Sequence, residues 1–314
     1  MKVFGSVESV MSYSQENLTY RMESKMTRKF LFIINPVAGK GATKKMIPII
    51  NKQFKDLEMD MKISKCVGDA TKIAKENCVF YTDIISVGGD GTLTEVIDGL
   101  KGYNGNLGVL PAGTGNDFSR ALALPKSIEG CLEVIINGKN KKVDVLKANN
   151  HRFINVASFG IDGGVIIETD KIKQKIPGTP AYIISSLKAI ANFKPYSVRI
   201  KIDEKILDRE IVLAAVGNGA FFGGGMHITP EAKLDDQLLD VVIANKTTKV
   251  KLVNLFSKLF KGTHMNDSCV EHYKCHRFSI ESQDDIYINT DGNLIGKIPA
   301  TISIEEEKIS ILIP

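Results

Sequence analysis

The stretch GGDGTLTEV combines glycines, a carboxylate and a hydroxyl in the way that phosphate chemistry requires. Gly88, Gly89 and Gly91 carry no Cβ atom, so the backbone N–H groups around them can approach an anion closely. Asp90 stands among them and would repel a bare phosphate, whereas a Mg²⁺ ion or an ordered water between the two would make its position favourable. The stretch therefore predicts a site for a phosphate and its metal, with the Thr92 hydroxyl at the start of the next helix.

Two other strand ends repeat this design. The segment LGVLPAGTGNDFSRAL is a short apolar strand followed by a glycine-rich turn, in which Asn116 and Asp117 are placed to cap the next helix. The segment LFIINPVAGKGAT ends a strand in the same way. Because parallel strands bring their carboxyl ends to one edge of a sheet, we expect the three turns to form one cradle for nucleotide phosphates. The predicted members of this cradle are Asn35, Pro36, Gly39, Gly88, Gly89, Asp90, Gly91, Thr92, Gly113, Thr114 and Asn116.

The established nucleotide signatures do not fit these turns. A P-loop ends in Gly-Lys-Ser/Thr, but Lys40 is followed by Gly41. The dinucleotide fingerprint fails as well, because GTGNDF has Phe118 where the third glycine should stand. Taken singly, each glycine pair could also be a tight strand-to-helix turn without a ligand. The threefold recurrence favours a phosphate site of another kind.

The elements that would position these turns alternate between strand and helix. Apolar runs indicate strands at KFLFIIN, MKISKCV, DIISV and LGVLP. Helical spacing indicates helices over residues 43–57, with Pro48 as an irregularity, and over Asp69–Cys78 and Leu93–Leu100. This alternation predicts parallel strands joined by crossover helices, which is an α/β domain.

Beyond about Lys139 the chain reads as a succession of strands. These are KKVDVLKA, RFINVASFG, YSVRIKID, EIVLAAVGNG, LLDVVIA, HRFSIES, DDIYINT and ATISIEE, interrupted by helical patterns near residues 181–193 and 248–261. The pattern is typical of a β-sandwich-like domain. The predicted organisation is a tail over residues 1–27, in which Met26 is an alternative start, an α/β nucleotide-binding domain over 28–140, and a β-rich domain over 141–314 whose last few residues can return to the first domain.

Composition narrows the class of protein. A chain of 314 residues with 43% apolar and 25% charged residues is long enough for two folded domains. The net charge of +5 is scattered, without the dense basic run of a nucleic-acid arm, so we expect no nucleic-acid partner. Five cysteines without a regular framework indicate a reducing cytoplasm. No apolar run is long enough for a membrane span.

In this order, NPVAGKG, GGDGTLTEV and LPAGTGNDFSRAL resemble the soluble bacterial diacylglycerol kinase and lipid kinase family, relatives of sphingosine and ceramide kinases. The resemblance extends from residue 28 to the end and includes GNGAFFGGGMHITPEAKLDDQLLDVVI. A GGDG turn alone also occurs in NAD kinases, whereas GTGNDF favours lipid kinases. The resemblance implies the two-domain fold shared by NAD kinases and diacylglycerol kinases, and an ATP- and Mg²⁺-dependent enzyme that phosphorylates a lipid hydroxyl, with diacylglycerol as the first candidate.

The same resemblance assigns further site residues. It adds Ser64 and Glu95 to the ATP contacts. It also places a structural Mg²⁺ on Asp236, assisted by the main-chain carbonyls of Lys233 and Leu238, and oxygen-only ligation suits that ion. Without the resemblance, the segment around Asp236 reads as an acidic turn before a strand.

One motif departs from the family. The family carries Asp-Gly-Glu late in the second domain, with the catalytic base, whereas this chain has TDGNL, with Asn293 in place of the glutamate. An asparagine cannot accept a proton at neutral pH, so a base at that position would leave the protein slow or inactive. Phosphoryl transfer depends mainly on positioning and charge neutralisation, and Asp291 can serve as base. We therefore assign Asp291 and Asp90 as catalytic, although Asp-Gly alone also predicts a hairpin turn.

The expected partners follow from this assignment. A lipid kinase needs ATP and a lipid acceptor at a membrane surface, which implies a cytoplasmic protein with peripheral membrane association, and the resemblance also implies a homodimer. The helix near residues 248–261 has lysines beside an apolar face, which fits either a membrane surface or a packed core. The alternatives are an NAD kinase, or a catalytically impaired nucleotide- or lipid-binding module, as Asn293 suggests.

Overall fold

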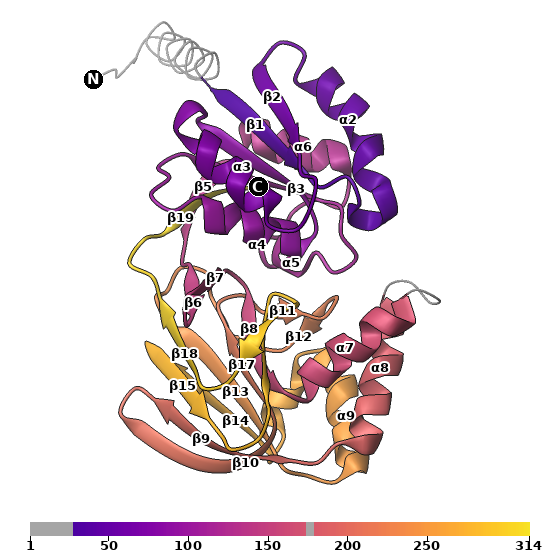
Figure 1. Cartoon of the computed structure of the whole chain (residues 1–314), viewed down its shortest axis with the longest axis vertical. Coiled ribbons are helices and arrows are strands. Elements are labelled where there is room, and N and C mark those ends of the chain that lie inside the picture. Colours follow the sequence, from indigo (N-terminus) through magenta and orange to yellow (C-terminus); the bar gives the residue numbers. More distant parts are fainter. Residues whose placement is uncertain (1–27, 174–178) are drawn as a thin grey trace, which may run out of the picture.

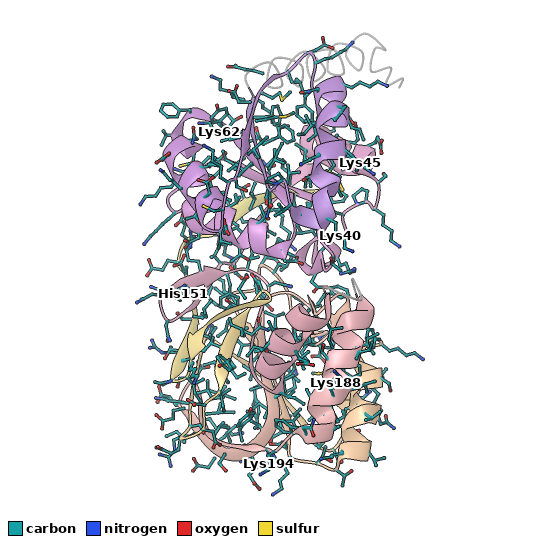
Figure 2. All side chains as sticks on the ribbon, turned by 45° about the vertical axis from the view of Figure 1, so that its right-hand side comes forward. Lys40, Lys45, Lys62, His151, Lys188 and Lys194 are labelled. Carbon is teal, nitrogen blue, oxygen red and sulfur yellow. The ribbon has the colours of Figure 1, made fainter. Side chains whose placement is uncertain are left out.

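The computed structural model describes residues 28–173 and 179–314, which form two domains stacked along the long axis of the molecule (Figure 1). The predicted tail, residues 1–27, and the alternative start at Met26 lie outside the described residues. Lysines are spread over both domains, with Lys40 and Lys45 on the first and Lys188 and Lys194 on the second (Figure 2).

The first domain is built on a six-stranded sheet of order β2-β1-β3-β4-β19-β5, in which only β5 runs antiparallel to its neighbour. Its strands are β1 (Lys29–Ile34), β2 (Glu58–Ile63), β3 (Asp83–Gly88), β4 (Asn106–Pro111), β5 (Lys139–Val143) and β19 (Ile309–Ile313). Its helices are α2 (Ala42–Gln53), α3 (Asp69–Asn77), α4 (Asp90–Gly99), α5 (Asp117–Ala121) and α6 (Ile128–Asn137), with 3-10 turns η1 (Ala38–Gly41) and η2 (Cys78–Phe80). The β19 strand comes from the end of the chain and completes this sheet.

Burial on both faces explains why the strands of the first sheet read as continuous apolar runs. Along β1, Leu31 and Ile33 join the core under α3 and α4, while Phe30 and Phe32 join the core under α2 and α6. Alternate residues of a strand point to opposite faces, so a sheet covered on both sides needs apolar residues at every position. Phe54 completes the second of these cores with edge contacts to both phenylalanine rings.

The second domain contains an 11-stranded sheet, curled around one large core, within the described residues. Its strands are β6 (Leu146–Ala148), β7 (His151–Phe153), β8 (Val156–Gly160), β9 (Tyr196–Ile202), β10 (Lys205–Gly217), β13 (Leu239–Asn245), β14 (Val270–Cys275), β15 (Arg277–Glu281), β16 (Tyr287–Thr290), β17 (Asn293–Lys297) and β18 (Ala300–Ile304). A small hairpin, β11 (Phe221–Phe222) and β12 (Met226–His227), and helices α7 (Ile161–Lys173), α8 (Thr179–Asn192) and α9 (Lys249–Leu259) pack beside it, with a 3-10 turn, η3 (Thr263–Asn266). The predicted fold class, α/β followed by a β-sandwich-like domain, is confirmed.

Several predicted element boundaries are wrong. The strand predicted from KKVDVLKA is divided into β5 in the first sheet and β6 in the second, because the chain crosses between the domains at Asp144 and Val145. The strand predicted from MKISKCV ends at Ile63, and the helix predicted from Leu93 begins at Asp90. Helix α7 was not predicted, since Gly163 and Gly164 weaken its helical pattern.

Polar contacts join the two domains near these crossings. The guanidinium of Arg152, on β7, bonds to Glu305 over 2.7 Å and donates to the carbonyl of Ile97, at the end of α4, over 2.9 Å. Both charged side chains of this pair are largely buried. The first-domain helix that begins at Asp90 is therefore fixed against the second domain at its far end.

Helix α9 packs on one side only. Leu252 and Leu255 are buried in a small core with α8, which confirms a core-packed face, while Val250 is 82% exposed. No helix in the described part of the chain has the length and apolar character needed to cross a membrane.

Candidate active site

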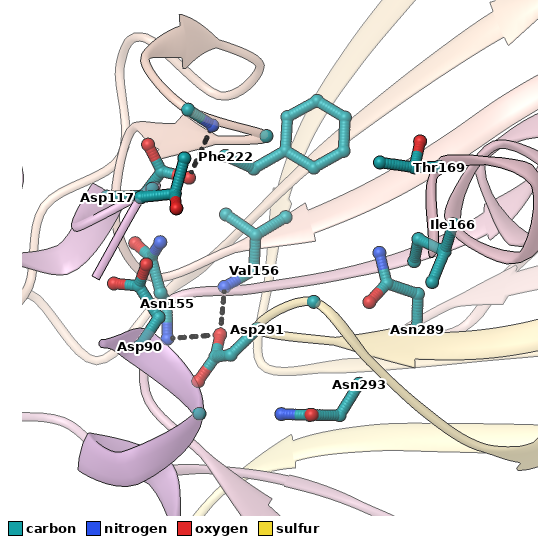
Figure 3. Close-up of a pocket in the computed structure, with 16 residues that line it drawn as sticks. Asp90, Asp117, Asn155, Val156, Ile166, Thr169, Phe222, Asn289, Asp291 and Asn293 are labelled. Atoms are coloured by element: carbon teal, nitrogen blue, oxygen red, sulfur yellow. Dashed lines mark hydrogen bonds between the residues drawn. The ribbon is translucent and has the colours of Figure 1, made fainter. Parts of the chain in front are cut away.

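A cavity of about 320 Å³ lies between the two domains, with the predicted phosphate turns on one side (Figure 3). It is lined from the first domain by Asp90, Gly91, Thr114, Gly115 and Asp117. From the second domain it is lined by Asn155, Val156, Ile166, Thr169, Phe222, Gly223, Gly224, Asn289, Asp291, Gly292 and Asn293. The cavity thus brings together carboxylates from both domains and an apolar side formed by the second.

The three glycine turns meet backbone to backbone. A Cβ atom on Gly113 would lie 2.5 Å from the Cα of Gly89, so these two turns can approach only as glycines. Gly39, which has a φ of 55°, would place a Cβ 2.1 Å from the carbonyl oxygen of Ala112. A Cβ on Gly88 would overlap the Thr92 side chain. The structure therefore brings together the ends of β1, β3 and β4, as the sequence predicts for a cradle.

A hydrogen bond from Asn35 orients the hydroxyl of Thr92. The Asn35 amide donates to Thr92 Oγ1 over 3.0 Å, and its carbonyl oxygen accepts from the backbone of Val37 over 3.1 Å. Because the Thr92 oxygen accepts from Asn35, its own proton is left to donate to a phosphate oxygen. Pro36, next in the chain, is half-buried in the same turn.

The other predicted ATP contacts have mainly structural partners. Ser64 is buried, and both its backbone and its hydroxyl bond to the carbonyl of Ile34. The carboxylate of Glu95 accepts from the backbone of Ala70, in the first turn of α3, over 3.2 Å. Both residues thus hold neighbouring elements at the cradle.

The second turn is shaped by one asparagine. Asn116 has a φ of 51°, and its side chain both accepts from and donates to the backbone of Gly113 over 2.9 Å. The prediction that Asn116 caps α5 with its side chain is wrong, because that side chain closes the turn instead. Thr114 is exposed and lines the cavity.

Two carboxylates converge beside Gly115. A Cβ on this glycine would lie 2.9 Å from Asp90 Oδ2 and 3.4 Å from Asp117 Oδ2. Asp90 Oδ1 accepts from the backbone of Phe118, and Asp117 is paired with Arg120 over 2.8 Å. Burial raises the pKa of Asp117 to about 6, and the nearby Asp90 contributes to the rise. Asp117 is a site residue that the sequence analysis treated only as a helix cap, although its place in GTGNDF was the available signal.

Asp291 occupies the tip of the β16–β17 hairpin. Asp291 and Gly292 both have positive φ, at 49° and 87°, between the paired residues Thr290 and Asn293. Two central residues with positive φ form the tight hairpin turn that Asp-Gly predicts. The Asp-Gly dipeptide can therefore form a hairpin turn and at the same time supply the candidate catalytic carboxylate.

The carboxyl group of Asp291 is enclosed, although the residue is partly exposed. It accepts from three consecutive backbone N–H groups, those of Ile154, Asn155 and Val156, over 2.9–3.1 Å, and from the Thr94 hydroxyl of α4 over 3.1 Å. Burial raises the pKa of Asp291 to about 6 against the lowering effect of these donors, and Asp90 adds to the rise. Such a pKa suits a general base near neutral pH.

Asn293 lies beside the first-domain turn. A Cβ on Gly91 would lie 3.8 Å from both terminal atoms of the Asn293 amide. The residue is exposed at the cavity mouth. Its amide can therefore contact a group held by the phosphate cradle, whereas Asp291 lies deeper.

The donors around the cavity fit magnesium. Asp90 and Asp117 offer converging carboxylate oxygens, and Mg²⁺ commonly uses one or two carboxylates together with substrate phosphates. The residues predicted for a second ion lie elsewhere, before β13. There Asp236 accepts from the backbone of Leu238 over 3.2 Å and faces Lys274 at 3.9 Å, and Lys233 is on the same loop. The described residues contain no cluster of three or more His, Cys, Asp or Glu side chains suited to a metal, so an ion on Asp236 would need main-chain oxygens.

Together, an α/β domain whose glycine turns meet at one sheet edge and a β-sandwich-like domain across an interdomain cavity define the class of NAD kinase-like and diacylglycerol kinase-like enzymes. Residues 29–148 match the model of the diacylglycerol kinase catalytic domain, and residues 155–313 match the YegS C-terminal NAD kinase beta sandwich-like domain. The chain belongs to the diacylglycerol kinase family and is a lipid kinase.

Named relatives agree with this assignment. A diacylglycerol kinase of Staphylococcus epidermidis is 35% identical over 294 residues, covering 92% of this chain and 93% of the relative. A diacylglycerol kinase of Staphylococcus aureus is 34% identical over 297 residues, with the same coverage. A crystal structure of a diacylglycerol kinase from Bacillus anthracis superposes with a TM-score of 0.73 at 27% identity, covering 91% of this chain and 97% of the other. These findings do not favour the NAD kinase alternative.

Proposed function

We propose that this protein transfers the γ-phosphoryl group of ATP, bound with Mg²⁺, to the hydroxyl of a membrane lipid, with diacylglycerol as the first acceptor. The observation that carries the proposal is Asp291, an enclosed carboxylate with a pKa of about 6 where the phosphate cradle faces the apolar side of the cavity. The names of the relatives support diacylglycerol as acceptor.

Each side chain has a role in the proposed reaction. The glycine turns and Thr92 bind the phosphates, and Asp90 and Asp117 would hold Mg²⁺, which neutralises phosphate charge when it is bound. The oxygen of the lipid hydroxyl forms a bond to the γ-phosphorus, and Asp291 accepts the proton of that hydroxyl. The bond between the γ-phosphorus and the β–γ bridging oxygen breaks, and ADP leaves. Asn293 orients the transferred group.

The residues on the acceptor side of the cavity favour a lipid as the acceptor. Val156, Ile166 and Phe222 present apolar side chains there, next to the buried polar groups Thr169 and Asn289 (Figure 3). A soluble dinucleotide acceptor would gain little from such a surface. Because the acceptor must come from a bilayer, we also propose that the protein is cytoplasmic and binds membranes peripherally. On the basis of the family resemblance, we further propose that it forms a homodimer.

The test is a transfer assay with radiolabelled ATP, Mg²⁺, vesicles that contain diacylglycerol, and NAD in the same mixture. Label in the lipid fraction is expected. Label in NAD would overturn the proposal in favour of an NAD kinase, and label in neither would favour an impaired binding module. Removal of Mg²⁺ with a chelator should abolish transfer, and sedimentation of protein with the vesicles tests membrane association.

A further inference from the structure

The glycine-rich hairpin of the second domain reaches the first domain at the cavity. Its strands β11 and β12 are joined by Gly223, Gly224 and Gly225, of which the first two line the cavity. The N–H of Gly224 donates to Asp117 Oδ2 over 2.8 Å, a bond that is drawn as a dashed line in Figure 3. The N–H of Gly225 also interacts with this carboxylate. The hairpin has no role in the proposed reaction, yet it contacts a candidate metal ligand.

The backbone conformation of the hairpin tip is one that only glycines adopt readily. Gly223, Gly224 and Gly225 have φ values of 62°, 87° and 107°. The usual three-residue hairpin loop has one residue in the left-handed region, so reversal of the chain does not by itself require three. Successive backbone N–H groups that converge in a turn form a concave site for an anion. Here the anion is the carboxylate of Asp117, held from the opposite domain.

The hairpin is fixed by the rest of the second domain. The side-chain nitrogen of Asn155 donates to the carbonyl of Phe221 over 2.6 Å, and the Phe221 ring lies 4.1 Å from the ring of His227. Met226, on β12, is 1% exposed. The backbone N–H of Asn155 bonds to Asp291 over 3.1 Å. One residue therefore supports both the hairpin and the candidate base.

Contacts from two sides orient the carboxylate of Asp117. Its Oδ1 accepts from Arg120 Nη1 over 2.8 Å, whereas its Oδ2 accepts from the hairpin. Each carboxylate oxygen has two acceptor sites, so each keeps one for another ligand. Asp117 Oδ2 and Asp90 Oδ2 both lie within 3.4 Å of the point that a Cβ on Gly115 would occupy. The two oxygens thus converge on one place, as shared ligands of an ion do.

We propose that the hairpin tip, Gly223–Gly225, positions Asp117 for the metal, so that the Mg²⁺ site of the first domain is complete only when the second domain contacts it. Hydrogen-bond partners of this kind orient metal ligands, and their loss typically lowers metal affinity about 10- to 100-fold. The tip is a positioning element, since it acts through Asp117. This inference depends on the proposed function, because the ion is the one that accompanies ATP.

The test measures metal binding directly. Mn²⁺ replaces Mg²⁺, and electron paramagnetic resonance follows free Mn²⁺ to give the Kd of the binding that requires ADP. Gly224→Ala keeps the N–H but strains a residue with a φ of 87°, so it should displace the tip and raise this Kd about tenfold. Gly102→Ala is the matched control, because Gly102 has a φ of 78°, has open space around its Cβ position, and follows the end of α4 opposite to Asp90. The control should leave the Kd unchanged.

A second background shows whether the hairpin acts through Asp117. With Asp117→Asn already present, Gly224→Ala should change the Kd less than about twofold, because two changes to one interaction do not add. A loss of similar size in both backgrounds, or no loss in the wild-type background, would overturn the inference. Gly225→Ala, at a φ of 107°, provides the same comparison if Gly224→Ala does not fold.

The lipid transfer assay separates this inference from the proposed function. If the wild type labels lipid and Gly224→Ala binds Mn²⁺ as tightly as the wild type, only the inference fails. If no lipid is labelled and the hairpin still controls the affinity for Mn²⁺, only the proposed function fails. A wild type that binds no Mn²⁺ in the presence of ADP would contradict both.

Discussion

Replacing Asp291 with asparagine should separate the proposed catalytic role of this residue from its structural one. The carboxylate accepts from three backbone N–H groups and from Thr94. An asparagine must turn its NH₂ group toward at least one backbone N–H, which leaves that donor without an acceptor. An unsatisfied buried donor costs about 1–3 kcal/mol, so the substitution destabilises the fold by that amount.

A second effect acts in the opposite direction. Burial raises the pKa of Asp291 from 3.8 to about 6. Deprotonation in the folded state therefore costs about 3 kcal/mol more than in the unfolded chain. Because the folded pKa is the higher one, the wild type loses this stability as the pH rises from below 3.8 through about 6. A neutral asparagine avoids that loss, so the two effects nearly cancel at pH 7.

The prediction is a variant of near-normal stability with little activity. The free energy of unfolding at pH 7, measured by urea titration, should lie within about 2 kcal/mol of the wild type, the difference of the two opposing effects. The rate of phosphoryl transfer should fall about 10²- to 10⁴-fold, as expected for the loss of a general base. Between pH 4 and pH 7 the stability of Asp291→Asn should improve relative to the wild type.

Asn293→Glu is the matched comparison, since it restores the family glutamate at an exposed position of the same hairpin. It should maintain or raise the rate and leave the pH dependence of stability unchanged. If Asp291→Asn retains more than a tenth of wild-type turnover, Asp291 is not the base. If its stability follows the same pH dependence as the wild type, the argument from burial is wrong.

Three further predictions concern the cradle, the metal and the domain contact. Gly113→Ala should raise the KM for ATP at least about tenfold, because its Cβ would lie 2.5 Å from Gly89 Cα; ATP titration of initial rates checks this. Asp117→Asn should raise the Mg²⁺ concentration for half-maximal rate, and the acid limb of the rate profile near pH 6 should shift, which a profile of kcat/KM between pH 5 and 8 would show. Arg152→Met should lower the free energy of unfolding by about 3 kcal/mol, because it leaves Glu305 unpaired in a largely buried position, and an unchanged urea midpoint would contradict this.

The sequence predicts the fold class and the phosphate cradle because both depend on local patterns. The apolar runs of β1 and β3 identify buried parallel strands, and each is followed by glycines at the edge where ligands bind. The backbone contact between Gly89 and Gly113 explains why two separate turns both need glycine. The glycine pattern of the two turns can therefore be recognised in the sequence, whereas the backbone contact that requires it is seen only in the structure.

The parts that could not be predicted depend on long-range contacts. Nothing local in KKVDVLKA shows that β5 pairs with β19, which begins at Ile309, while β6 pairs with β18. Asp117 reads locally as a helix cap, and only the approach of Asp90 shows that it belongs to the candidate metal site. Asn289 stands in an ordinary strand sequence, and its buried hydrogen bonds go to Ser158 and Asp162, more than a hundred residues earlier in the chain.

The position of the candidate base connects the chemistry to the arrangement of the domains. Helix α4 begins with Asp90 at the phosphate cradle and carries Thr94, which bonds to Asp291 of the second domain. One helix thus positions both the candidate metal carboxylate and the hydrogen-bond partner of the candidate base, and Asp90 also helps to raise the pKa of Asp291. Asn293 lies outside this enclosure, exposed at the cavity mouth, so its effect on catalysis should be on the orientation of the transferred phosphoryl group and not on proton transfer. The loss of the family glutamate is therefore compatible with an active kinase.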